Sequence, residues 1–92
     1  MYFLAINKVK QGADTGELMA IIPQHVRWTM EQIGKGVVAQ AGKWGEYGGM
    51  ILFSAEDAES ARNFLNGDPL INSGLVDVEM ERLYPDVQIK QV

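Results

Sequence analysis

The sequence predicts an α+β fold whose elements follow the order β-α-β-β-α-β in a single domain, residues 1–92. Two observations carry this prediction. Four short segments are rich in branched and aromatic residues, which is typical of strands, and two longer segments repeat apolar residues at helical spacing. The chain has room for one hydrophobic core, yet 47% of its residues are hydrophobic. We therefore expect part of its surface to be buried against a second chain.

The first half of the chain predicts a strand, a helix and a second strand. Residues 2–9 predict a strand that is apolar on both faces, as is usual where a sheet is covered on both sides. Residues 17–33 predict a helix with Pro23 in its first turn, where a missing N–H costs nothing, so the regular helix begins near Ile22. Residues 37–41 predict the second strand. The core-facing stripe of the helix consists of Ile22, Val26, Met30 and Ile33.

The connection to the third strand is rich in glycine and carries two large aromatic side chains, Trp44 and Tyr47. Its glycines do not match a phosphate-binding loop, because they join two strands and no lysine-serine pair follows them. Residues 50–53 predict the third strand. Ser54 or Ala55 opens the second helix, which has several acidic residues in its first turn, where they suit the helix dipole.

A short capped turn over residues 68–74 and a strand over residues 75–83 complete the pattern, and residues 87–92 predict a short extra strand or a tail. Right-handed crossovers then give a ferredoxin-like arrangement, a four-stranded antiparallel sheet with two helices on one face. The other face is open, and we expect Phe3 and Ala5 among its residues. Two sheets packed face to face would cover it, which predicts a homodimer with the architecture of a dimeric α/β barrel, or a higher oligomer.

Composition excludes several classes of function. The net charge is −4 and no basic run exists, which argues against binding to nucleic acid or to an anionic membrane. The chain has no cysteine and one histidine, which argues against disulfides, thiolate nucleophiles and zinc sites. The apolar run at the N-terminus is too short to span a bilayer and lacks a basic start. We therefore expect a soluble, cytoplasmic protein.

The single histidine, His25, is the main candidate for chemistry. It lies in the first half of the first predicted helix, and Asp68 follows the end of the second. The predicted topology brings both positions to the same end of the molecule. An imidazole with a carboxylate within reach is a candidate acid/base dyad, and this chemistry needs no metal or organic cofactor.

The same end of the molecule collects residues suited to hold a small aromatic or apolar substrate. Trp28 shares the side of the helix that carries His25. The candidate substrate-binding residues are Trp28, Trp44, Tyr47, Met50 and Pro69. Aromatic residues of this kind are more often core or interface residues than platforms for a substrate.

Each member of the predicted dyad also has a purely structural interpretation. His25 is compatible with a partly exposed position on the flank of a helix. Asp68 precedes Pro69, and aspartate before proline is a common helix start with the aspartate as N-cap. Capping and orienting a histidine are compatible, because a carboxylate has two oxygens.

The ordered set of motifs resembles the YCII-related proteins over almost the whole chain. The motifs are Pro23-x-His25, Gly48-Gly49, residues 58–65, Asp68-Pro69-Leu70 and Gly74-Leu75-Val76. The resemblance implies a ferredoxin-like dimeric barrel with a His-Asp active site, which carries over to His25 and Asp68. One branch of the family removes chloride from chlorinated, hydroxylated aromatics, and related barrels include cofactor-free monooxygenases and lactone isomerases. This chain has Leu70 where phenylalanine is frequent, so the identity of the substrate does not transfer.

The leading hypothesis is therefore a cofactor-free enzyme that uses His25 and Asp68 for proton transfer on a small molecule. An elimination such as dehydrochlorination, or an isomerisation, of a hydroxylated aromatic substrate would suit these residues. The alternative is a non-catalytic dimeric module that binds a small molecule or serves a neighbouring enzyme. A third option is the cofactor-free oxidation of an electron-rich phenol.

Overall fold

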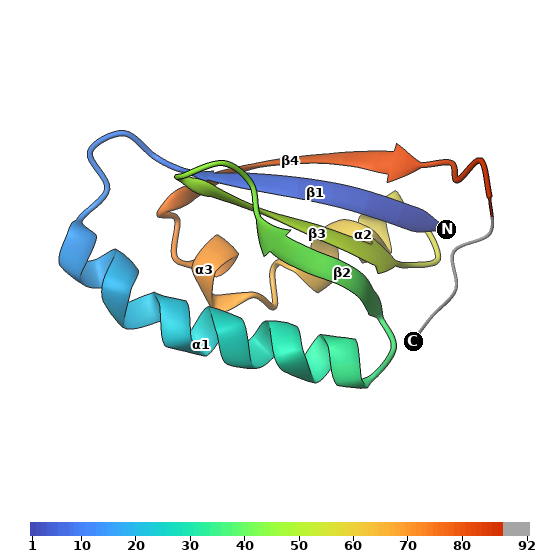
Figure 1. The fold of residues 1–92 in the computed structure, drawn as a ribbon, viewed down its shortest axis with the longest axis horizontal. Helices are drawn as coiled ribbons and strands as arrows, with labels where there is room; N and C mark the ends of the chain where they lie inside the picture. Colours follow the sequence, from blue (N-terminus) through green and yellow to red (C-terminus); the bar gives the residue numbers. More distant parts are fainter. Residues whose placement is uncertain (88–92) are drawn as a thin grey trace.

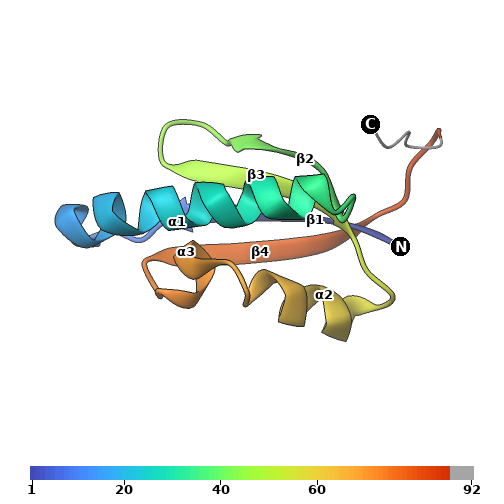
Figure 2. The same cartoon turned by 90° about the horizontal axis from the view of Figure 1, so that it is seen from below.

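The computed structural model describes residues 1–87, so most of the predicted C-terminal strand or tail lies outside the described residues. One sheet, with strands in the order β2-β3-β1-β4 and antiparallel pairing throughout, is covered on one face by helices (Figures 1 and 2). The strands are β1 (Tyr2–Val9), β2 (Val38–Lys43), β3 (Gly48–Ser54) and β4 (Val76–Leu83). The helices are α1 (Thr15–Gly34), α2 (Ala58–Leu65) and α3 (Pro69–Asn72). This is the predicted ferredoxin-like order, with α3 as an additional single turn.

The core lies between α2 and the sheet, and aromatic rings form its centre. Phe53 is fully buried, and its ring lies 4.8 Å from Phe64 of α2 and 6.0 Å from Phe3 of β1. Trp28 extends this cluster to α1, with its ring 5.0 Å from that of Phe64. Offset and tilted pairs at these distances are favourable for aromatic side chains.

The two faces of β1 are the reverse of the prediction. Phe3 and Ala5 are buried against the helices, so the expectation that they lie on the open face is wrong. The neighbouring positions Tyr2, Leu4 and Ile6 are only partly buried and alternate with them, on the face without helices. A strand that is apolar at every position leaves this choice open, because a shift of one residue exchanges the faces.

Helix α1 is also rotated relative to the prediction. The stripe expected to face the core is exposed: Ile22, Val26, Met30 and Ile33. The partly buried stripe consists of Leu18, Ile21, His25, Trp28, Thr29 and Gln32. No residue of α1 is fully buried, so this helix is attached to the rest of the molecule less tightly than α2 is.

The start of α1 is fixed by an N-cap that the prediction missed. The side chain of Asp14 accepts a hydrogen bond from the backbone N–H of Glu17 at 2.8 Å, so the helix begins at Thr15. Pro23 is therefore in the helix interior and not in the first turn, contrary to the prediction. A proline there removes one hydrogen bond, to the carbonyl of Met19, and its ring crowds that carbonyl.

A similar cap starts α2 three residues later than predicted. The side chain of Asp57 accepts a hydrogen bond from the backbone N–H of Ser60 at 2.7 Å. The hydrogen bonds from Ser60 lower the pKa of the Asp57 carboxyl, because they stabilise its charged form. Ser54 and Ala55, where the helix was expected to begin, form the end of β3 and the loop that follows it.

The replacement Pro23→Ala should stabilise the protein. Alanine restores the backbone N–H and removes the ring, so we expect the free energy of unfolding to rise by about 1–3 kcal/mol. Equilibrium unfolding in urea measures this change. The exposed neighbour Gln24, replaced by alanine, is the control and should change the free energy by less than about 0.5 kcal/mol. A less stable Pro23→Ala variant would contradict the argument.

Candidate active site

The rotation of α1 directs His25 toward α3. His25 belongs to the partly buried stripe of the helix, and α1 packs against α3 and β2. The hydroxyl of Thr29, one turn later, donates a hydrogen bond to the backbone carbonyl of His25 at 2.9 Å. The imidazole is therefore presented from a regular helix and not from a loop, which limits its freedom of movement.

Asp68 is held by the short segment that links α2 to β4. It is the N-cap of α3, and its Oδ1 accepts the backbone N–H of Leu70 at 2.9 Å. Pro69 occupies the first helical position, where its missing N–H is not needed. The predicted cap is thus present, and it fixes the orientation of the carboxylate.

The two side chains meet, as the topology predicted. Nδ1 of His25 lies 2.8 Å from both carboxylate oxygens of Asp68. The side chain of Asp68 is 3% exposed and that of His25 is 25% exposed. An ionised carboxylate only accepts hydrogen bonds. Nδ1 of His25 is therefore the protonated ring nitrogen, and its N–H donates a hydrogen bond to Asp68. In the neutral imidazole, Nε2 then has a free lone pair and can accept a proton.

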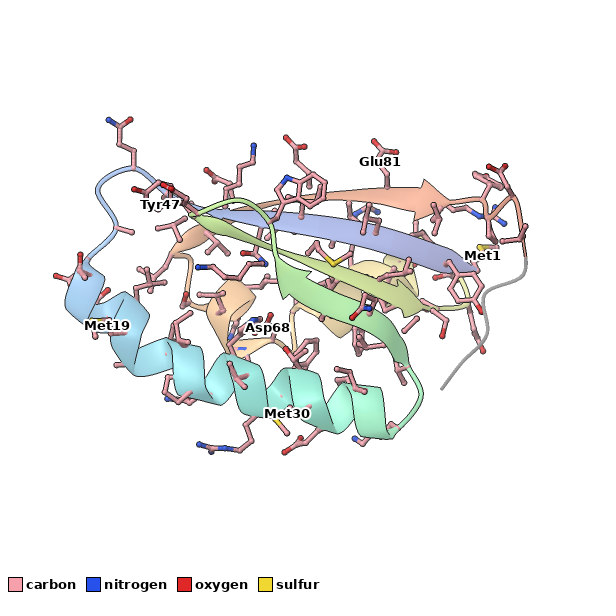
Figure 3. The ribbon with its side chains drawn as sticks, viewed as in Figure 1. Met1, Met19, Met30, Tyr47, Asp68 and Glu81 are labelled. Carbon is pink, nitrogen blue, oxygen red and sulfur yellow. The ribbon has the colours of Figure 1, made fainter. Side chains whose placement is uncertain are left out.

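This pair lines a cavity of about 620 Å³ between α1 and the sheet, which we call the α1–sheet cavity. Its size falls within the usual range for small-molecule sites. Apolar side chains dominate one wall, including the exposed stripe Ile22, Val26, Met30 and Ile33 of α1. The cavity is open to solvent, because these residues and Tyr47 are exposed. Figure 3 shows Asp68 between the sheet and α1, facing this helix.

The predicted substrate-binding residues divide into two groups. Tyr47 and Met50 are among the residues that line the α1–sheet cavity. Trp28, Trp44 and Pro69 are not among them. Trp28 instead packs against Phe64 and close to Gly67, and Trp44 is exposed in the turn between β2 and β3.

The prediction missed four polar residues in the cavity wall, Asn7, Thr29, Lys43 and Glu46. Asn7 is almost fully buried, on the same face of β1 as Phe3 and Ala5. The signal in the sequence is an amide that directly follows five consecutive apolar residues, Tyr2 to Ile6. The predicted faces of the strand place this amide on the open side of the sheet, away from the helices.

The described residues contain no group of three metal-ligating side chains of the types His, Cys, Asp and Glu placed to hold a metal ion. Among the helices within residues 1–87, none has the length and apolar character needed to cross a membrane.

Comparison with known proteins identifies a family and two solved structures of the same fold. A family model, the YCII-related domain, matches residues 1–82. No curated protein sequence matches the chain significantly. The structure is similar to that of 5-chloro-2-hydroxyhydroquinone dehydrochlorinase (TftG) from Burkholderia phenoliruptrix AC1100, in complex with 2,5-dihydroxybenzoquinone. The TM-score is 0.75 at 20% identity, over 91% of this chain and 94% of that chain.

Muconolactone isomerase is similar to a comparable degree, with a TM-score of 0.73 at 17% identity over 95% of this chain and 94% of that chain. At these identities the likeness shows the fold alone. That fold is the four-stranded antiparallel sheet with helices on one face.

Two replacements of Asp68, by alanine and by asparagine, should destabilise the protein to different extents. Asp68→Ala loses the cap of α3 and the charged partner of His25, so we expect the free energy of unfolding to fall by about 2–4 kcal/mol. Asp68→Asn keeps an oxygen for the N–H of Leu70 and loses only the charge, so the fall should be about half as large. Urea unfolding at pH 7 measures both. The exposed acid Asp77, replaced by alanine, is the control. Equal stability of the Asp68→Ala and Asp77→Ala variants would contradict the assigned role.

Proposed function

The chain belongs to the family of YCII-related domains, and we propose that it is a small-molecule enzyme in which His25 transfers a proton and Asp68 orients it. The observation that carries this proposal is the contact of 2.8 Å between Nδ1 and a buried carboxylate at the wall of a cavity of substrate size. A buried, oriented carboxylate stabilises the imidazolium that forms when Nε2 takes a proton.

The proposed reaction begins with the removal of a proton from the substrate by Nε2 of His25. In an elimination, the electron pair of the broken bond to hydrogen forms a new double bond, and chloride leaves with the electron pair of its own bond to carbon. In an isomerisation, the imidazolium returns the proton to a different carbon. Asp68 keeps its hydrogen bond to Nδ1–H in both reactions, so the positive charge on the ring is balanced when it appears.

A hydroxylated ring is the substrate class that we propose. The apolar stripe of α1 suits the face of a ring, and the polar residues of the α1–sheet cavity suit its oxygen substituents. The two solved structures of the same fold are named as a dehydrochlorinase, in complex with 2,5-dihydroxybenzoquinone, and as a lactone isomerase. Their names support this class, and the low identity leaves the individual substrate open.

A second candidate function is a binding module without turnover, and one observation favours it. Asp68 already has a structural role as the N-cap of α3, which explains its burial without any chemistry. In that case ligands would bind in the α1–sheet cavity and leave unchanged. The two functions differ in whether a product forms.

The decisive experiment is a turnover assay with chlorinated hydroxyhydroquinones, in which released chloride is measured by ion chromatography, and with muconolactones. We expect His25→Ala to lower kcat about 10²–10⁴-fold, because this is the usual contribution of proton transfer by a positioned base. Asp68→Asn should lower kcat to a smaller extent, because Nε2 remains in place. The Gln24→Ala variant, altered on the exposed side of α1, is the control. Full activity of His25→Ala would exclude the proposed role, and ligand binding without product would favour the binding module.

We also propose that the open face of the sheet is a homodimer interface. This face carries the partly buried residues Leu4, Ile6 and Leu52, with Leu4 paired to Leu52 across the strands. Glu79 and Glu81 flank them on β4, and Figure 3 shows Glu81 pointing away from the helices. An apolar strip with a charged edge is typical of an interface core and its rim.

The variant Leu52→Glu tests this interface, because it adds a charge in the middle of the strip opposite Leu4. We expect the natural chain to have the mass of a dimer, or of a multiple of a dimer, in light scattering after size exclusion. Leu52→Glu should shift the mass toward that of a monomer. Asn63→Glu, on the exposed side of α2, is the matched control and should leave the mass unchanged. A monomeric natural chain at micromolar concentration would exclude the proposal.

A further inference from the structure

We propose that Asn7 is a substrate-binding residue, whose side-chain amide donates a hydrogen bond to an oxygen substituent of the substrate in a slot over Gly49. The inference rests on the proposed function, since it concerns the same cavity. It narrows the substrate class to planar rings that carry an anionic oxygen, and it is tested by binding and not by turnover.

The first argument is that the amide of Asn7 is buried and free. Asn7 is 7% exposed, and within residues 1–87 its side chain forms no hydrogen bond. No side-chain nitrogen or oxygen in this part of the chain is sealed from solvent without a partner. The amide atoms therefore still reach open space, and the space that Asn7 lines is the α1–sheet cavity. Buried amides are nearly always hydrogen-bonded, so this one has capacity for a ligand.

The second argument is that Gly49 leaves room for this amide. Gly49 is the cross-strand partner of Asn7 on β3. A Cβ at Gly49 would lie 3.2 Å from Nδ2 and 3.4 Å from Oδ1 of Asn7, and 3.4 Å from the carbonyl oxygen of Gly42. The φ of Gly49 is not in the left-handed region, so its backbone does not require glycine. The absence of a side chain at Gly49 therefore keeps the space above the amide of Asn7 open.

The third argument is the charge at the outer end of this slot. Lys43 on β2 pairs with Gly49, so Lys43, Gly49 and Asn7 form one row across three strands. Two strand spacings of about 4.8 Å each place the backbones of Lys43 and Asn7 about 10 Å apart. Both residues line the α1–sheet cavity, and no salt bridge of Lys43 is formed within the described residues. An amide donor with an ammonium group nearby suits an anionic oxygen.

The geometry also separates the proposed roles. Asn7 and Lys43 come from the sheet, which forms the floor of the cavity, and His25 comes from α1, which forms the opposite wall. A ring held by its oxygen over Gly49 would present its remaining atoms to the apolar stripe and to Nε2 of His25. A ring without an oxygen would leave the amide of Asn7 buried without a partner, so we expect such a ring to be rejected.

Binding of 2,5-dihydroxybenzoquinone, measured by calorimetry at pH 7, tests the proposal. This probe is a planar ring that is anionic at neutral pH. We expect Asn7→Leu to weaken its binding at least 10-fold, and Asn7→Asp to weaken it further, because a carboxylate repels the anion. Asn63→Leu, an exposed asparagine of α2, should bind as the natural chain does. Affinity within twofold of the natural chain for Asn7→Leu, or no binding by the natural chain at millimolar concentration, would overturn the proposal.

The melting temperature of Asn7→Leu provides a test that needs no ligand. Leucine is close to asparagine in size and has no polar atoms, so replacing an amide that forms no hydrogen bond within the described residues should leave Tm unchanged or raise it by a few degrees. A structural hydrogen bond of Asn7 would have the opposite effect. A Tm lower by more than about 5 °C would therefore overturn the assignment as a binding residue.

The slot itself is tested by Gly49→Ala. The added methyl group crowds the amide of Asn7, so the probe should bind about 10-fold more weakly. Gly34→Ala, where an added methyl group meets nothing within 4 Å, is the control. An unchanged affinity of Gly49→Ala for the probe would overturn the proposal that the substrate lies in a slot over Gly49. The test measures binding alone, so a failure of the proton-transfer proposal, seen as full turnover by His25→Ala, leaves this test intact.

Discussion

The structure depends on one buried carboxylate, that of Asp68. A charge removed from water must be matched by hydrogen-bond donors, and Asp68 has them in the N–H of Leu70 and in Nδ1 of His25. The first donor fixes the start of α3, and the second connects α3 to α1. Because no residue of α1 is fully buried, this polar contact and the packing of Trp28 against Phe64 together attach the helix to the rest of the molecule.

An attachment of this kind explains why the cavity exists. A helix held by a broad apolar face packs closely on its sheet and leaves no space beneath it. Helix α1 instead turns His25 and Trp28 toward α3 and the core, and its most apolar stripe remains exposed along the α1–sheet cavity. The uncovered apolar surface costs stability to the isolated protein, and it is the surface to which we propose that a ring binds. Such a conflict between stability and function is common at binding sites.

The order of elements, the sheet topology and the meeting of His25 with Asp68 could all be predicted from the sequence. Strands and helices differ in period, turn residues separate them, and few topologies join them. The sequence did not predict in the same way which face of β1 and which face of α1 point to the interior. Every position from Tyr2 to Ile6 is apolar, so the pattern did not distinguish the face of Phe3 from that of Leu4. On α1, two neighbouring stripes differ by a rotation of about 100°, the angle between successive residues.

Both errors have the same physical cause. Assigning apolar residues to the interior is correct for a core, but the interior positions of this molecule include His25 on α1 and Asn7 on β1. On each element the polar residue made the true inner face look like the outer one. Each is in the interior for a stated reason: His25 binds Asp68, and the amide of Asn7 lies at the cavity beside Gly49. The two places where the hydrophobic pattern fails are thus the two walls of the cavity, which agrees with the proposal that ligands bind there.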